Sequence, residues 1–179
     1  MIKRVPAVLI ELKPSSVHKG GVGVFVTSDV RQGQKLADGI SEEDYRDLIP
    51  WPAVEQYDRE VRNKIHDFCV GTLEGFIPPP DLDFNKLSIE WYLNHSCEGN
   101  CGFNDDGDFV AIRAIGKGEE LNYDYALVES NPSFLMHCTC GSRKCRKVIT
   151  GNDWKDDEFR FKHREYMHPH LRRLVPIPA

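Results

Sequence analysis

The sequence lacks long apolar runs, a basic excess and low-complexity segments. No stretch of its 179 residues approaches the length of a membrane-spanning helix, and the apolar run near the start, broken by Pro6, is too short for a usual secretory signal. Lysine and arginine number 23 against 28 acidic residues, which disfavours a general nucleic-acid binder with a basic face. We therefore expect a soluble, intracellular domain with no membrane partner, in the nucleus or the cytoplasm.

The cysteines are few but clustered. Three of the six form a Cys-x-Cys-x4-Cys pattern: Cys138, Cys140 and Cys145. In a reducing compartment such a cluster indicates a metal rather than disulfides, and structural zinc requires four ligands in a tetrahedron. Spacing alone leaves the fourth ligand open among three residues: Cys97, Cys101 and Cys69.

Patterns of apolar and turn residues predict a mainly β chain with inserted helices. Residues 8–12 and 22–27 are typical of strands, and residues 101–115 of a hairpin that turns at 105–107. Ser41, followed by three acids, predicts a helix start, and residues 54–73 predict one amphipathic helix with Cys69 in or near the core. A last helix, capped by Asn152 or Asp153 and ended near Pro169, is expected to carry four aromatic side chains: Trp154, Phe159, His163 and Tyr166.

Two short motifs are ambiguous when each is taken by itself. Asn94 and His95 precede Ser96-Cys97, and a lone histidine is more often structural than catalytic. Tyr123 and Tyr125 are one residue apart, so they share a face of the predicted strand, where a pair of core aromatics would be the ordinary interpretation.

The order of the motifs is more specific than any one of them. KGGVGVF, NHSC, ELNYDY and the cysteine pattern follow one another in a chain that resembles the SET-domain protein lysine methyltransferases with a post-SET zinc motif, over residues 17–154. The resemblance implies small curved sheets around a threaded pseudoknot, a post-SET zinc loop and a C-terminal helix. It divides the chain into a SET domain (1–126, with a helical insertion at about 41–90), a post-SET zinc-binding segment (127–153) and a C-terminal helix and tail (154–179).

The resemblance also implies roles for individual residues. Tyr125 matches the family's catalytic tyrosine and Cys97 the fourth ligand of one structural zinc ion. The residues that match the S-adenosylmethionine site are Gly21, Val22, Gly23, Asn94, His95 and Tyr125. Since glycine has no Cβ, the main chain at Gly21 and Gly23 can approach a ligand closely.

The implied activity is transfer of a methyl group from S-adenosylmethionine to a lysine side chain of a protein or peptide, histone tails among the candidates. A hydroxyl at Tyr123 can hold a water that crowds the amine, which favours monomethylation, and Trp154 is expected to cover part of the substrate channel. One alternative is a SET-like module that binds zinc and peptide without turnover. A zinc-dependent nucleic-acid binder is disfavoured, because acids interleave with the basic residues near the C-terminus.

Overall fold

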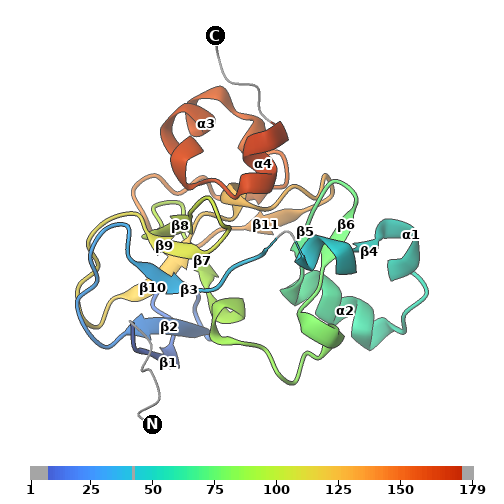
Figure 1. The fold of residues 1–179 in the computed structure, drawn as a ribbon, viewed down its shortest axis with the longest axis horizontal. Coiled ribbons are helices and arrows are strands. Elements are labelled where there is room, and N and C mark those ends of the chain that lie inside the picture. Colours follow the sequence, from blue (N-terminus) through green and yellow to red (C-terminus); the bar gives the residue numbers. More distant parts are fainter. Residues whose placement is uncertain (1–7, 42, 175–179) are drawn as a thin grey trace.

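The computed structural model describes residues 8–41 and 43–174, and their fold is mainly β with short helices (Figure 1). The main sheet has seven strands. They are β1 (Ile10–Pro14), β2 (Val22–Val26), β3 (Lys35–Ala37), β7 (Asn94–His95), β8 (Cys101–Phe103), β9 (Phe109–Ala111) and β10 (Glu120–Tyr123). The predicted hairpin is confirmed, because β8 and β9 pair antiparallel around a turn in which Gly107 has a φ of 86°.

Strand β10 is where distant parts of the chain meet. It pairs antiparallel with β2 and parallel with both β7 and β8. Asn94 lies opposite Asn122, and His95 lies opposite Tyr123. The segment that follows β7 continues along β10, since the Ser96 N–H donates to the Tyr123 carbonyl at 3.0 Å. This topology brings the NHSC segment beside the ELNYDY segment, as the resemblance implied.

The inserted region forms a separate lobe beside the main sheet (Figure 1). It contains η1 (Asp44–Asp47), β4 (Ile49–Pro50), α1 (Trp51–Val54), α2 (Arg59–Phe68), β5 (Val70–Gly71), β6 (Gly75–Ile77) and η2 (Pro80–Leu82), and the chain returns through η3 (Ile89–Tyr92), which packs against β2 of the main sheet. The predicted single helix over 54–73 is wrong. Asp58 adopts an extended conformation and caps a new helix by accepting the Val61 N–H at 2.9 Å, so α1 and α2 are separate. Of the helix predicted to start at Ser41, the described residues form the single turn η1.

The C-terminal part is likewise divided into short elements. After η4 (Tyr125–Leu127) come β11 (Leu135–His137), β12 (Val148–Thr150), η5 (Asp153–Lys155), α3 (Asp157–His163), η6 (Arg164–Tyr166) and α4 (Pro169–Leu174). The expected continuous last helix is wrong, because extended Asp156 caps α3 by accepting the Phe159 N–H at 2.8 Å. Pro169 begins α4 rather than ending a helix, which agrees with the tolerance of proline in a first helical turn.

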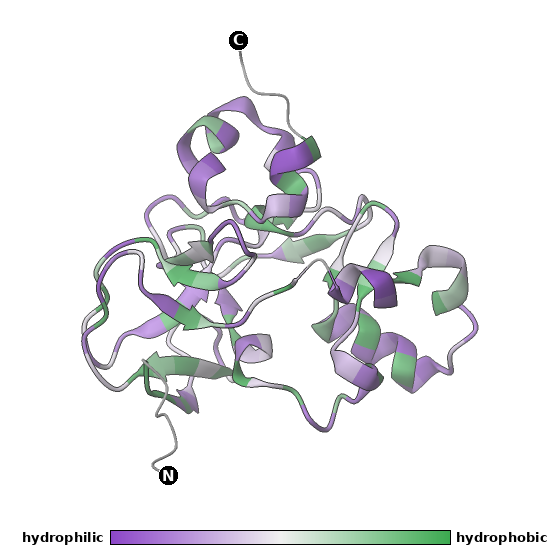
Figure 2. Ribbon diagram, viewed as in Figure 1, coloured by the Kyte–Doolittle hydropathy of each residue, from purple (hydrophilic) through white to green (hydrophobic). Residues whose placement is uncertain are grey.

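Three apolar clusters stabilise these parts. The largest lies under the main sheet and includes Phe103, Leu121 and Leu127, and the strands that contribute to it are largely hydrophobic (Figure 2). The lobe has its own core, in which Cys69 is buried as expected. The third cluster surrounds the clustered cysteines and includes Ile149.

Candidate functional site

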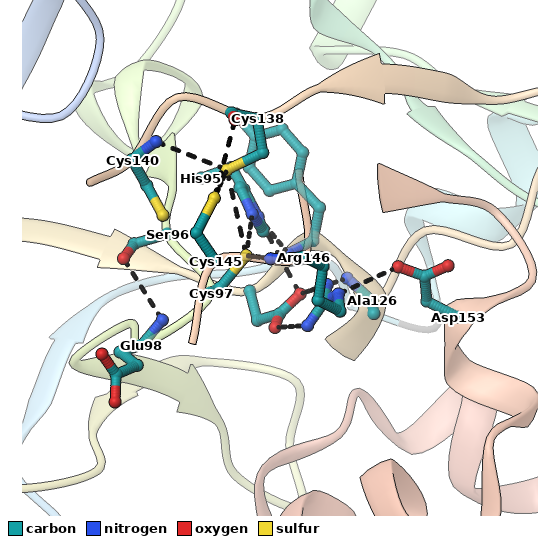
Figure 3. Close-up of polar contacts among 12 residues, drawn as sticks. His95, Ser96, Cys97, Glu98, Ala126, Cys138, Cys140, Cys145, Arg146 and Asp153 are labelled. Carbon is teal, nitrogen blue, oxygen red and sulfur yellow. Dashed lines mark hydrogen bonds and ion pairs between the residues drawn. The ribbon is translucent and has the colours of Figure 1, made fainter. Parts of the chain in front are cut away.

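Four cysteine side chains converge beside β10 (Figure 3). Their Sγ atoms all lie within 4.8 Å of one another, and the residues are Cys97, Cys138, Cys140 and Cys145. Cys138 lies 3.9 Å from Cys97 and 3.6 Å from Cys145, measured between Sγ atoms. A tetrahedral zinc with Zn–S bonds of about 2.3 Å requires thiolates about 3.8 Å apart, so the donor set fits a structural zinc ion.

The structure distinguishes among the three cysteines that spacing left open. Cys97 follows β7 and joins the cluster. Cys69 is buried in the lobe core, and the Cys101 thiol in β8 donates to the Asn100 side-chain oxygen at 3.2 Å. A four-thiolate cluster has no open coordination position, and its role would be to tie the segment after η4 to the main sheet.

Arg146 lies in the loop that carries the clustered cysteines (Figure 3). Its side chain connects this loop to Asp124, the residue that follows β10. Its guanidinium donates to the two Asp124 oxygens at 2.5 and 2.7 Å and to Asp153 at 3.1 Å. Asp124 is buried and also accepts the Ala126 N–H. The pattern of the sequence did not reveal Arg146, because its partner lies 22 residues away.

His95 lies beside the cysteine cluster (Figure 3) and connects it to Tyr125. Its Nδ1 accepts the Tyr125 N–H at 3.1 Å, so the ring proton is on Nε2, which lies 3.3 Å from the Cys97 sulfur. Burial lowers the pKa of His95 to about 4, and the ring is neutral at pH 7. Both ring nitrogens therefore have protein partners, and the imidazole positions Tyr125 and Cys97.

Tyr125 begins η4 at the end of β10. Its hydroxyl donates to the Leu93 carbonyl at 3.2 Å, and its ring is 4.9 Å from the Tyr123 ring, measured between centroids. Burial, with the negative charge of Glu129 as a second cause, raises the pKa of Tyr125 to about 12. The phenol is therefore a neutral donor at pH 7 and cannot serve as a base.

The glycine motif lies on β2 beside Asn94. The side-chain nitrogen of Asn94 donates to the Val22 carbonyl at 2.7 Å, and a Cβ on Gly23 would lie 2.2 Å from a Glu120 oxygen. A Cβ on Gly21 would lie 2.3 Å from the His18 ring. In this structure, then, side chains of the protein itself occupy the space that the two glycines provide.

Glu120 organises this corner, which the sequence did not predict. Its carboxylate accepts hydrogen bonds from both Ser15 and Ser16 side chains at 2.7 and 2.6 Å, from the Ser16 N–H at 2.6 Å and from Asn94 at 3.1 Å. Burial alone would raise its pKa, but these hydrogen bonds outweigh it and lower the pKa. Glu120 therefore stays ionised and holds the Ser15–Gly23 region against Asn94.

A cavity of about 360 Å³ lies where the lobe, the sheet and the segment after η4 meet. Its volume is in the range of small-molecule sites. Aromatic and apolar side chains form much of the lining: Phe68, Phe76, Trp91, Leu93, Phe103, Phe109, Tyr123, Tyr125 and Phe134. Tyr123 is buried there, in edge-to-face contact with both Phe103 and Phe109.

Trp154 does not line this cavity. It is buried in the main core, and its indole nitrogen donates to the Gly151 carbonyl at 2.9 Å. The geometry thus corrects its expected place over the substrate channel, because η5 turns the ring inward. Glu129 does line the cavity, and the sequence pattern gave no indication of it.

The comparisons with known proteins agree with this arrangement. A family model, the SET domain, matches residues 21–126. Histone-lysine N-methyltransferase trithorax of Drosophila virilis is 38% identical over 141 residues, covering 74% of this chain and 3% of that protein. Histone-lysine N-methyltransferase ASHH2 of Arabidopsis thaliana is 29% identical over 148 residues, covering 78% of this chain and 8% of that protein.

Histone-lysine N-methyltransferase ash1 of Drosophila melanogaster is 36% identical over 97 residues, which are 50% of this chain and 4% of that protein. The chain therefore belongs to the SET-domain family, and it carries a cysteine cluster of the post-SET kind. It spans at most 8% of the length of these three relatives. Within the described residues, no helix is both long enough and apolar enough to cross a membrane.

Proposed function

We propose that this chain is a protein-lysine N-methyltransferase that uses S-adenosylmethionine and one structural zinc ion. The observation that carries the proposal is the position of Tyr125. Its ring lines the cavity, its hydroxyl donates to the Leu93 carbonyl next to Asn94, and its main chain is held by His95. The three relatives, all named histone-lysine N-methyltransferases, point to the same activity.

The residues proposed to contact the cofactor are Gly21, Val22, Gly23, Asn94, His95 and Tyr125. In support of this, the Asn94 side chain donates to the Val22 carbonyl, and His95 accepts the Tyr125 N–H. The hydrogen bonds of the Asn94 side chain use its nitrogen, so its side-chain oxygen is left as an acceptor. Val22, beside it, is 47% exposed. This acceptor fits a ligand with amino and hydroxyl groups that donate hydrogen bonds and that lies across the main chain. When bound, S-adenosylmethionine supplies a methyl group activated by its sulfonium.

The chain's own contribution is alignment. The neutral Tyr125 hydroxyl can hold the amine in line with the methyl group, and the aromatic walls exclude bulk water from the reacting nitrogen. The zinc-bound cysteines and Arg146 fix the segment after η4, which forms one side of the cavity. Reaction therefore requires the sheet, the lobe and this segment together.

Tyr123 is proposed to limit the number of methyl groups. Its ring is wedged between Phe103, Phe109 and Tyr125. Burial raises the pKa of the Tyr123 phenol well above its usual value, so the hydroxyl stays neutral and can hold a water beside the amine. Such a water occupies the space that a second methyl group would need.

The substrate is proposed to be a lysine of a protein, and histone tails are the first candidates because of the relatives' names. That substrate would place the chain in the nucleus, or wherever its target protein lies.

The domain limits at 126 and 153 remain predictions, which limited proteolysis would test.

The experiment that tests the activity is incubation of the zinc-loaded chain with labelled S-adenosylmethionine and an array of lysine peptides that includes histone tails. Tyr125→Phe should lower turnover by about 100-fold, the order of loss that a misplaced reacting group causes. Tyr166→Phe is the matched control, because that hydroxyl only contacts Gln32 at the surface.

Two results would contradict the proposal. Equal turnover by Tyr125→Phe and Tyr166→Phe would remove the role of Tyr125. Calorimetry that detects peptide binding but no S-adenosylmethionine binding would instead indicate a SET-like module without turnover.

A further inference from the structure

One buried carboxylate in the lining of the cavity has no role in the proposed methyl transfer. Glu129, which follows η4, is 7% exposed and lines the cavity with Tyr123 and Tyr125. One oxygen accepts the Gly71 N–H at 2.9 Å, and the other accepts the Asn131 N–H at 2.8 Å. These bonds fix the carboxylate, and each oxygen keeps a second lone pair for a further donor.

The neighbouring backbone leaves room for this carboxylate. A Cβ on Gly71 would lie 2.3 Å from a Glu129 oxygen and 2.6 Å from the Asn131 Cβ. Glycine at this position of β5 therefore lets the lobe approach Glu129 closely. The side chain joins the lobe to the segment after η4 at the wall of the cavity.

The cavity as a whole is anionic. Three carboxylates line it, Asp67, Glu90 and Glu129, and the described residues of the lining include no lysine or arginine. Their exposure differs, since Asp67 is exposed, Glu90 is half-buried and Glu129 is buried. Glu129 is the least exposed of the three carboxylates. Water therefore screens its attraction for a cationic group in the cavity less than it screens the attraction of the other two.

Glu129 also lies close to the two phenols. Its charge contributes to the raised pKa values of both Tyr123 and Tyr125. Burial raises the pKa of Glu129 itself to about 7, against the opposing effect of the Asn131, Gly71 and Ser130 N–H groups. A carboxylate in this condition lacks a compensating cation, which an entering ammonium group would provide.

We propose that Glu129 is the specificity-determining residue that binds the ammonium group of the substrate lysine as it enters the cavity. The inference rests on the proposed function, and it adds a charged receptor to the aromatic channel. An ammonium group offers three donors, so it can use the free lone pairs of Glu129 while the backbone bonds remain. Neutral side chains of the same length carry no positive charge for the carboxylate to attract and bind less tightly.

The test uses two small probes that mimic the lysine side chain, n-butylammonium and n-butanol, on the full zinc-loaded chain. NMR titration gives the two dissociation constants at pH 7.5. Wild type should bind butylammonium about tenfold more tightly than butanol, because only the ammonium carries a charge that the carboxylate attracts. Glu129→Gln should reduce this ratio to about one, and Glu90→Gln, whose carboxylate is more exposed, should reduce it only about twofold.

Glu158→Gln, an exposed acid in α3, makes the same charge change far from the cavity lining and should leave the ratio at the wild-type value. Equal binding of the two probes to wild type would overturn the inference, even if Glu129→Gln failed to fold. An equal loss in Glu90→Gln and Glu129→Gln would also overturn it. Because the probes need no turnover, a chain that distinguishes them but methylates no peptide would contradict the proposed function alone.

Discussion

The ion pair between Arg146 and Asp124 permits a quantitative prediction about how the cysteine loop is held. Asp124 is 3% exposed, and the guanidinium supplies two of its hydrogen bonds. Arg146→Met removes these bonds and leaves a buried carboxylate with the Ala126 N–H as its remaining donor. Loss of one partner from a buried pair costs about 3–5 kcal/mol, and the 29% exposure of the arginine side chain favours the lower end, about 3 kcal/mol.

A double variant separates the charge from the packing. In Asp124→Asn with Arg146→Met, the buried charge is gone, so the loss should be about 2 kcal/mol smaller than the sum of the two single losses. The measurement is urea-induced unfolding at fixed zinc concentration, followed by tryptophan fluorescence. Arg113→Met is the matched control, because its ion pair with Glu119 is exposed and should contribute less than about 1 kcal/mol.

The reasoning is refuted if Arg146→Met is no more destabilising than Arg113→Met. It is also refuted if the losses of the two single variants simply add in the double variant. In either case the close contact between Arg146 and Asp124 would contribute little to holding the loop against β10.

Three further predictions concern the metal, the product and pH. Cys140→Ser should leave the sheet folded by circular dichroism but lower bound zinc, measured by atomic absorption, and abolish turnover; wild-type rates would contradict the closing role of the loop. Tyr123→Phe should shift the product, followed by mass spectrometry, from one methyl group toward two or three, and unchanged methyl counts would oppose the proposed water. Burial lowers the pKa of His168 to about 4 from an ordinary 6.5, so its contribution of about 3 kcal/mol should be present above pH 6.5 and lost as the pH falls toward 4. His168→Asn should reduce the slope of the unfolding free energy over this window without abolishing it, because burial lowers the pKa of His95 to about 4 as well. An unchanged slope would exclude His168 as a cause.

The sequence by itself determined the family and the features that depend on neighbouring residues. The order of its motifs indicated a SET domain, and the spacing of Cys138, Cys140 and Cys145 indicated a metal loop. The hairpin turn at Gly107 also followed from local chemistry. Such features need only a few consecutive residues, so a pattern suffices to predict them.

Only the tertiary structure decided which distant side chains meet. Spacing left the fourth thiolate open, and the family resemblance assigned it to Cys97. The parallel pairing of β7 with β10 is what brings Cys97 to a cluster whose other members begin 41 residues later. Glu129 reaches Gly71 over 58 residues. Helix patterning also failed where the capping residue Asp58 interrupts an otherwise periodic apolar stretch. In each case the contact depends on how the chain crosses itself, which hydrophobic periodicity does not encode.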